Sequence, residues 1–334
     1  MYHVNVFGMM SVLALLGVLP TWASSVEAYA FTAAGQSSCA TFGPTAQVRR
    51  TIGSGSIEVA TPGSGCNVTQ NLMDITGVAG LLNAHSAAAG GGNTTFGVFS
   101  YNGTSRSQGD YHTLGVEAEG SLSGATDAFS TRGSEAFVNM ADGYTAPAMG
   151  STAFAEFKYR IHGTQTLSGR GETTMELLWA KNGGPGFLAF RAQNGSGTGP
   201  TVNVNGTYVS TLPGMAITTD SITMNTDLSF LVPAIANERF DLNMVLYGSA
   251  IPAASTGLSL PSSIADDFFG TLTLTGISVL DSQGTVISGA QVLRDSDALA
   301  EIPEPGSMLL VGAVLAALAL IPKTRSSLTG MTQK

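Results

Sequence analysis

Apolar and polar residues alternate in several short runs of this sequence, a pattern that a helix cannot sort onto two faces. In 155–161 (A-E-F-K-Y-R-I), Phe157, Tyr159 and Ile161 fall on one side of an extended backbone and the charged residues fall on the other. This spacing predicts a β-strand with one buried face. The same alternation recurs in 241–247 and 271–275.

Weaker alternation and turn-forming spacers extend the strand pattern along the chain. The further candidate strands are 95–101, 173–180, 187–192, 201–209 and 221–232. Between strands lie Gly-, Asn- and Pro-rich spacers such as 181–185, and the pairs Asn194-Gly195 and Asn205-Gly206, whose residues tolerate positive φ. Strands at this spacing, without long amphipathic helices, predict an all-β, antiparallel two-sheet β-sandwich that is jelly-roll-like.

Residues 31–150 carry the least regular pattern and are rich in Gly, Ser and Ala. We expect this part to be a looser face of the same domain. One short helix is expected within it, ended by the glycines of 90–92. The helical spacing joins Val78, Leu81, Leu82 and His85.

A turn motif marks the end of the strand-rich region. Residues 265–286 read as a strand, a turn at 281–284 (D-S-Q-G) and a second strand. The domain is therefore expected to end near Gly289 and to be followed by a short spacer up to Glu301.

Composition separates this chain from several functional classes. Only 11% of the residues are charged, and the formal net charge is −9. An acidic chain with few lysines lacks the basic patches that bind phosphate backbones, so nucleic acid is not expected as a partner. Gly accounts for 42 of the 334 residues, which favours turns between strands over long helices.

The N-terminus has the character of a secretory signal peptide. An apolar segment is ended by Pro20, and two small-x-small sites follow at 21–23 (T-W-A) and 28–30 (A-Y-A). We expect cleavage after Ala30, with Ala23 as the alternative. A buried first helix is the other interpretation, and the absence of a polar face on this segment disfavours it.

A second apolar segment lies near the C-terminus, at 308–321. As a helix it would be about 21 Å long, which is shorter than the ~30 Å hydrocarbon thickness of a bilayer. Pro303 and Pro305 keep the preceding residues extended. An extended tripeptide beside a short span suits recognition by a membrane protease, and an ordinary tail anchor is the alternative.

Pro303-Glu304-Pro305, the short apolar segment and the cations Lys323 and Arg325 together resemble the PEP-CTERM sorting signal of Gram-negative bacteria. The resemblance implies processing by an exosortase, a membrane-embedded enzyme, after a signal peptidase has acted. It also implies that the tail is removed and that the body is delivered to the cell surface or the extracellular polysaccharide matrix.

The expected layout therefore has three parts: a signal peptide at 1–30, an exported β-sandwich at 31–300 and a sorting signal at 301–334. The C-terminal helix is expected to hold the chain in the inner membrane only transiently. The resemblance implies a structural or adhesive role linked to exopolysaccharide, and the chain is not expected to be an enzyme.

Two cysteines, Cys39 and Cys66, lie in the first third of the chain. In an exported protein two lone cysteines are expected to pair, and two free thiols are the alternative. A bridge closing a loop of this size contributes roughly 3–4 kcal/mol in the loop-entropy model. The disulfide would therefore staple a Gly-rich region that has few strand signals.

Acidic residues near the end of the body form the candidate metal site. Carboxylate oxygens are hard ligands that suit Ca²⁺, and solvated turns are the alternative interpretation. The candidate ligands are Asp266, Asp267 and Asp281, with Asp295 and Asp297 nearby in the sequence.

Catalytic patterns are sparse in the sequence. The sequence contains no G-x-S-x-G motif, and 110–112 (D-Y-H) is the one cluster that resembles part of a hydrolytic triad, with a polar loop as the alternative. Glu117 and Glu119 would share a strand face, as glycosidase carboxylates can, but solvated faces carry such pairs too. A secreted hydrolase is the third hypothesis, and it requires His112 or His162 beside a carboxylate and a hydroxyl.

The second hypothesis is a glycan-binding module, either calcium-dependent or built on an exposed aromatic platform. The aromatic candidates are Tyr101, Tyr111 and Tyr208. Trp179 ends a candidate strand and is expected in the core.

Overall fold

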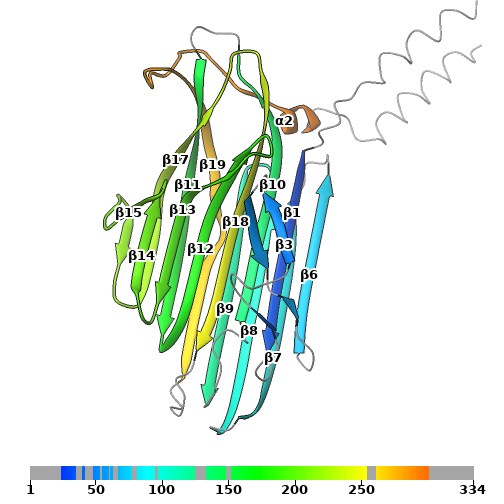
Figure 1. Ribbon diagram of the computed structural model, residues 1–334, viewed down its shortest axis with the longest axis vertical. Coiled ribbons are helices and arrows are strands. Elements are labelled where there is room, and N and C mark those ends of the chain that lie inside the picture. Colours follow the sequence, from blue (N-terminus) through cyan, green and yellow to red (C-terminus); the bar gives the residue numbers. More distant parts are fainter. Residues whose placement is uncertain are drawn as a thin grey trace, which may run out of the picture.

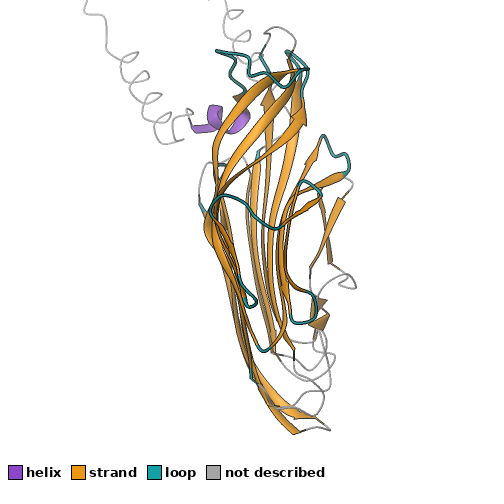
Figure 2. Ribbon diagram, turned by 90° about the vertical axis from the view of Figure 1, so that its left-hand side faces the viewer, coloured by secondary structure: helices purple, strands orange, loops and turns teal. Residues whose placement is uncertain are grey.

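The computed structural model describes residues 24–34, 40–41, 48–52, 55–59, 61–62, 67–76, 81–94, 97–124, 133–147, 152–253 and 261–300. These residues form an all-β sandwich of two antiparallel sheets (Figure 1 and Figure 2), which confirms the predicted fold class. The chain crosses between the sheets repeatedly, whereas β7–β8–β9 and β12–β13–β14–β15 are meanders within one sheet.

The first sheet has the strand order β15-β14-β13-β12-β18-β10-β1-β6, and β20 pairs with one end of β10. Its strands are β1 (Ser25–Ala34), β6 (Asn67–Thr76), β10 (Gly133–Thr145), β12 (Arg170–Lys181), β13 (Gly186–Gly195), β14 (Gly199–Val204), β15 (Thr207–Val209), β18 (Arg239–Ala253) and β20 (Leu293–Arg294). A short helix, α2 (Asp295–Ala300), follows β20 directly.

The second sheet has the order β16-β17-β11-β19-β9-β8-β7. Its strands are β7 (Leu82–Thr94), β8 (Gly97–Gly109), β9 (Thr113–Gly124), β11 (Thr152–Ser168), β16 (Met215–Ile217), β17 (Ser221–Pro233) and β19 (Ser262–Asp281). At about 3.3 Å per residue, a strand as long as β19 spans about 65 Å. The sandwich is therefore elongated along its strands.

Four short strands form two small separate pairs. Strand β2 (Ala40–Thr41) pairs with β5 (Thr61–Pro62), and β3 (Val48–Ile52) pairs with β4 (Gly55–Val59). Contacts of β3 with β18, and of β4 with β13, place the second pair against the first sheet.

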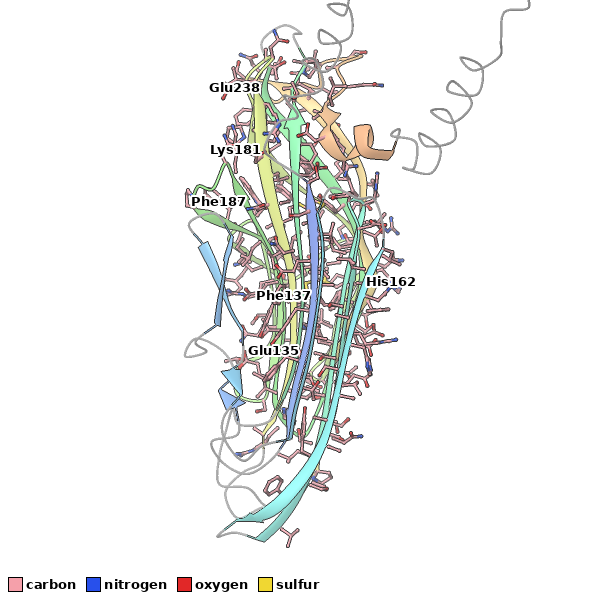
Figure 3. The ribbon with its side chains drawn as sticks, turned by 90° about the vertical axis from the view of Figure 1, so that its right-hand side faces the viewer. Glu135, Phe137, His162, Lys181, Phe187 and Glu238 are labelled. Atoms are coloured by element: carbon pink, nitrogen blue, oxygen red, sulfur yellow. The ribbon has the colours of Figure 1, made fainter. Side chains whose placement is uncertain are left out.

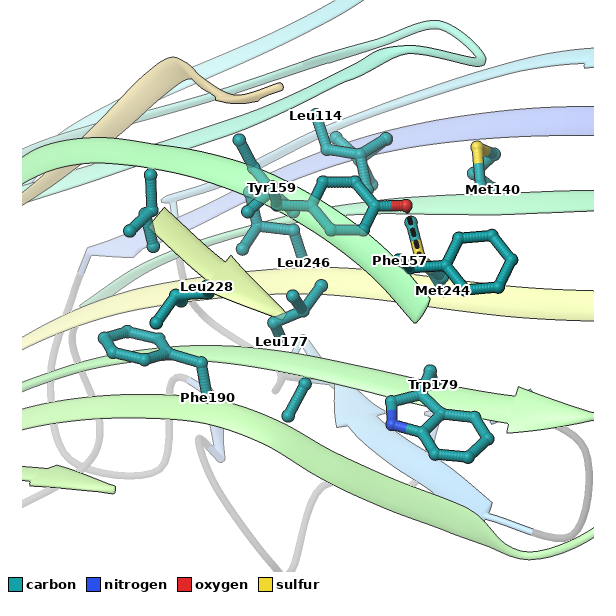
Figure 4. Close-up of a cluster of buried hydrophobic side chains, with 14 of the residues drawn as sticks. Leu114, Met140, Phe157, Tyr159, Leu177, Trp179, Phe190, Leu228, Met244 and Leu246 are labelled. Carbon is teal, nitrogen blue, oxygen red and sulfur yellow. Dashed lines mark hydrogen bonds between the residues drawn. The ribbon is translucent and has the colours of Figure 1, made fainter. Parts of the chain in front are cut away.

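The core lies between the sheets and uses the side chains that the alternation predicted. Phe157, Tyr159 and Ile161 on β11 are buried, and Leu242, Met244 and Leu246 on β18 are buried opposite them. The Tyr159 hydroxyl donates a hydrogen bond to the Met244 sulfur at 3.0 Å across the core (Figure 4). Trp179 on β12 is also buried, as predicted.

The Asn-Gly pairs had mixed outcomes. Asn205 (φ 49°) and Gly206 (φ 82°) form the two-residue turn between β14 and β15, as predicted. Both residues are in the left-handed region, which matches the twist of the flanking strands. Asn194 and Gly195 end β13, and the turn to β14 begins at Gly195, whose carbonyl accepts the Thr198 amide at 3.2 Å, so the predicted turn is present but shifted toward the C-terminus.

The helix predicted around Val78–His85 was wrong, because 82–94 form strand β7. Leu82, Ala84 and Ala88 are buried while His85 is exposed, which is a period of two. Small alanines hid this period, because Ala carries little strand preference of its own. The prediction that residues 31–150 form a looser face was also wrong for the described residues, because β1 and β7–β10 are long regular strands in both sheets.

The turn predicted at 281–284 is confirmed, with the Gly284 amide donating to the Asp281 carbonyl at 3.1 Å. The second strand of the predicted hairpin is reduced to a single bridge between Leu280 and Val286. The chain then reaches β20 and α2, so the described body continues beyond Gly289.

Candidate functional site at the junction of the two chain ends

The two ends of the described body lie side by side on the same edge of β10. Antiparallel pairing of β1 with β10 begins at Ser25 opposite Ala141. Pairing of β20 with β10 places Arg294 opposite Tyr144. Strand β20 therefore continues along β10 from the point where β1 starts, and α2 lies next to the beginning of β1 (Figure 1).

Asp142 lies on β10 between these two pairings and binds residues from both ends of the described body. Its Oδ1 accepts a hydrogen bond from Ser24 Oγ at 2.6 Å, and from the backbone amides of Gly143 at 2.9 Å and Ser296 at 3.1 Å. Its Oδ2 accepts the Ser296 hydroxyl at 2.5 Å and faces Arg294 Nη2 at 3.4 Å. A buried carboxylate is tolerated when it is paired and hydrogen-bonded in this way.

Arg294 supplies the positive charge of this cluster and is itself buried. Its Nη2 donates to the Tyr111 carbonyl at 2.5 Å, and its Nη1 donates to His112 Nε2 at 3.0 Å. Burial disfavours the guanidinium charge, but the negative field of Tyr144 and Asp142 outweighs it and raises the pKa of Arg294. The arginine thus ties the β8–β9 turn to the C-terminal segment.

A second ion pair holds the start of α2. Arg239 on β18 binds Asp295 through Nε at 3.0 Å and Nη2 at 2.7 Å. The pair lies against the backbone of Gly143, where a Cβ atom would collide with both side chains. Glycine at this position therefore permits the close approach. We call Ser24, Asp142, Arg294 and Ser296 the terminal junction.

The residues of the expected sorting signal, Pro303, Glu304 and Pro305, lie outside the described residues, as do Cys39 and Cys66 and the apolar segment 308–321. The described chain stops at Ala300, directly before the sorting motif in sequence. Among the residues that the structure does describe, no helix is long and apolar enough to cross a bilayer.

Ala30, the expected signal-peptide cleavage site, lies within β1. It is fully buried and pairs with Asn71 of β6 and Ala136 of β10. Ala23, the alternative site, immediately precedes the first described residue, Ser24. A cut after Ala30 would therefore fall inside a strand that is paired on both sides.

The calcium candidates are not brought together. Asp266 is buried between the sheets, its neighbour Asp267 is exposed, and Asp281 stands at the opposite end of β19. Asp295 binds Arg239, and Asp297 lies 3.7 Å from Arg294. In the ranges that the structure describes, no three His, Cys, Asp or Glu side chains form a metal-binding group. The expected clustering of these aspartates was wrong, because most of the length of β19 separates Asp281 from Asp266 and Asp267.

Buried Asp266 has instead a raised pKa. Burial of the carboxyl group raises its pKa well above the usual value, against the opposing effect of Gln165 Nε2, which donates to Oδ1 at 3.1 Å. The protonated form therefore predominates to higher pH in the folded protein than in the unfolded chain.

This pKa shift predicts that stability falls as pH rises above the ordinary Asp range. Below that range Asp266 is protonated in both the folded and the unfolded protein, so it does not change the free energy of unfolding. At higher pH the unfolded chain ionises first, and the free energy of unfolding falls by about 1.4 kcal/mol per pH unit until the pKa of the folded state is reached. We expect Asp266→Asn to be more stable than the original protein at pH 7 and nearly equal at pH 3. Urea unfolding across this range measures the difference.

Exposed Asp267→Asn is the matched control for that series, and we expect it to follow the original pH profile. An Asp266→Asn protein that loses stability by the same amount at every pH would contradict the titration of a buried carboxyl group.

The catalytic candidates are separated or engaged in other contacts. Glu117 is buried and forms an ion pair with Arg106 of β8, while Glu119 is exposed. Asp110 Oδ1 caps the β8–β9 turn by accepting the backbone amides of His112 at 2.7 Å and Thr113 at 2.6 Å. His112 contacts Arg294 and not a carboxylate. Residues 110–112 therefore match the alternative interpretation, a polar loop that leads into a strand.

The remaining histidine of the hydrolase hypothesis, His162, lies on β11 and is exposed. Figure 3 shows His162 and Phe187 on opposite sides of the sandwich. His162 pairs across the sheet with Asn225 of β17. Its neighbour Ile161 pairs with Leu272 of β19, which pairs in turn with Leu114 of β9, so one strand separates His162 from the strand that follows 110–112.

Of the three aromatic candidates for glycan stacking, only Tyr208 is exposed, whereas Tyr101 and Tyr111 are buried. A pocket of about 630 Å³ opens at the other end of the sandwich from the terminal junction. Gly, Ser and Thr residues at the end of β11, around the β13–β14 turn, before β17 and at the start of β19 line most of it, and Asp220 is the one charged side chain in its wall.

The terminal junction could not be found from the sequence. Ser24 and Asp142 are 118 residues apart, and Asp142 and Ser296 are 154 residues apart. No local motif links them, because the contact depends on β1 and β20 sharing one neighbour in the sheet. In the sequence, Asp142 falls in the least regular part of the chain and Arg294 in the expected spacer after Gly289, so neither stood out as a candidate.

In comparisons with protein-family models, with curated proteins and with solved structures, no significant match to this chain was found.

Proposed function

We propose that this chain is an exported structural or adhesive protein of the cell surface or extracellular matrix, processed at both ends by a signal peptidase and an exosortase. The β-sandwich is its working part, and its role is not catalytic. The termini carry this proposal through their resemblance to export and sorting signals.

The observation that best supports the proposal is the position of the terminal junction. Ser24 and Ser296 bind the same carboxylate, so the leader and the sorting segment join the body at one end. Two apolar segments that start from one end of a rod can reach the same bilayer. The body would then project away from the membrane by about 65 Å, the length of its longest strand.

The docking of the C-terminal segment on β10 also fits this proposal. A docked C-terminal segment keeps the approach to the sorting motif short, because β20 and α2 are fixed on β10 up to Ala300. A processing enzyme in the membrane would therefore find the tripeptide at a defined distance from the folded body.

Replacement of Pro303, Glu304 and Pro305 by alanine tests the proposal. We expect the variant to be exported but to remain in the inner-membrane fraction with its tail attached, because the exosortase no longer recognises it. The double variant Ser326→Ala/Ser327→Ala, beyond the apolar segment, is the matched control and is expected to be sorted normally.

Fractionation of cells and culture medium, followed by intact-mass measurement, provides the readout in a host that contains an exosortase. A triple-alanine variant that still loses its tail and leaves the membrane would refute the sorting proposal.

A glycan-binding module is the second candidate, and the distal pocket favours it. If the terminal junction faces the membrane, this pocket faces outward, and its hydroxyl-rich wall can hydrogen-bond a neutral saccharide. The exported protein applied to a glycan array, with and without calcium, distinguishes the two roles. Binding that disappears in Asp220→Ala would favour the module, and no binding would leave the structural role.

A further inference from the structure

We propose that the leader is removed between Ala23 and Ser24, and that the new α-ammonium group of Ser24 joins the Asp142 cluster. This inference rests on the proposed export of the chain and specifies where its maturation occurs.

The first argument is the role of β1 in the sheet. Residues from Ser25 to Ala33 pair with β6 on one side and with β10 on the other. A cut after Ala30 would remove most of this strand, including Ala28, which is fully buried between the sheets. Each buried backbone group left without a partner costs about 1–3 kcal/mol. Because whole domains are stable by only about 5–15 kcal/mol, the mature sandwich requires the intact strand.

The second argument is that β1 cannot extend toward lower residue numbers along β10. The place next to Tyr144 and Thr145 is taken by β20, whose Arg294 and Leu293 pair with them. The chain that precedes Ser25 must therefore leave β10 before it reaches Tyr144, three positions beyond the pair of Ser25 with Ala141. The sandwich is complete from Ser24 onward, and the small-x-small site 21–23 ends at the residue before it.

The third argument is the environment of Ser24. Its side chain is almost fully buried, and Oγ donates to Asp142 Oδ1 at 2.6 Å. In the hydrolysis, water adds across the peptide bond: the Ala23 carbonyl carbon gains the hydroxyl group, and the Ser24 nitrogen gains a proton. The released amine has an ordinary pKa of about 7.7–8.0, so it takes up a second proton and is largely cationic near neutral pH.

The charges around the terminal junction favour this new cation. Acidic groups outnumber basic groups among the described residues there, with Asp142, Asp241, Asp295 and Asp297 beside Arg239 and Arg294. An ammonium group on Ser24 would bring a positive charge to the buried carboxylate that its own hydroxyl already contacts. Removal of the leader would thereby strengthen the contact that also holds Ser296.

The N-terminal peptide of the exported full chain, read by mass spectrometry, tests the cut. We expect it to begin at Ser24. A protein that begins at Phe31, or at any other internal residue, would overturn this inference and leave export intact. A protein that retains Met1 would overturn both the inference and the proposed export.

Two substitutions give an independent test that does not depend on folding, because a signal peptidase acts before the body folds. Ala23→Leu is expected to abolish processing, since the site requires a small residue. Ala30→Leu is the matched control and is expected to leave the mature N-terminus at Ser24. The reverse pattern, with processing lost only in Ala30→Leu, would overturn the inference.

The ammonium contact has its own readout. Acetic anhydride at neutral pH acylates exposed α-amines, so the Ser24 amine is expected to react more slowly in the folded protein than in urea. Asp142→Asn, which keeps the shape of the side chain and removes its charge, is expected to speed the reaction. Equal rates in folded and unfolded protein would overturn the contact.

Discussion

Replacement of Asp142 by alanine is expected to lower the free energy of unfolding by about 3–5 kcal/mol, because it leaves the charge of Arg294 buried without its buried partner and with only the exposed Asp297 nearby. The hydroxyl groups of Ser24 and Ser296 lose their acceptor in the same step. A loss of this size is a large share of the roughly 5–15 kcal/mol that stabilises a typical domain. Urea unfolding of the purified protein measures it.

Asp227→Ala is the matched control for that variant. Asp227 pairs with Arg160 at 3.3 Å, but its side chain is 68% exposed. Exposed pairs contribute about 0–1 kcal/mol, so a small effect is expected. Equal losses in the two variants would show that the terminal junction contributes no more than a surface ion pair.

Limited proteolysis gives a second view of the same variant. With Asp142 replaced, Ser296 loses both of the hydrogen bonds that its hydroxyl and amide donate to that carboxylate. Residues of β20 and α2 are therefore expected to become the first sites of cleavage. Unchanged cleavage at this end would contradict the role assigned to Asp142.

Replacement of Phe230 by alanine is expected to cost about 3–5 kcal/mol through the cavity it leaves in the core. The Phe230 ring stacks on Phe157 at 5.5 Å and on Tyr159 at 5.9 Å within the second sheet. It also stacks on Trp179 of the first sheet at 5.3 Å. Aromatic pairs add about 0.5–1.5 kcal/mol beyond buried area, so loss of this ring removes a contact between the sheets as well as volume.

Phe187→Ala is the matched control, because this ring also stacks on Trp179, at 4.7 Å, but is 48% exposed. We expect a loss of about 1 kcal/mol, close to the value of one aromatic pair. Thermal or urea unfolding compares the two variants. A Phe230→Ala protein as stable as Phe187→Ala would contradict the assignment of Phe230 to the centre of the core.

The sequence predicted the sheets best where large apolar residues alternate with charged ones. In β11 and β18 the side chains that face the core are those with the period of two, because only one register buries all of them. In β7 the prediction was wrong, since Ala and Ser at buried positions differ little from Ala and Asn at exposed ones. Chance spacing of a few apolar residues then resembled a helical face.

The functional residues also divide into those that the sequence can indicate and those that only the fold brings together. The segments that resemble export and sorting signals are contiguous in sequence, so the resemblance is visible without a structure. The terminal junction is a property of topology: Ser24, Asp142 and Ser296 meet because two strands from opposite ends of the chain share β10. The carboxylate of Asp266 was assigned to solvent or calcium, because no sequence pattern shows that its strand face is the inner one.

The intact mass of the protein recovered from outside the cell tests the central claim most directly. The account predicts a shortened chain that starts at Ser24 and ends near Pro303, having lost both apolar segments of the 334-residue precursor. Recovery of the uncut precursor as the stable form, held in the inner membrane or the cytoplasm, would contradict it.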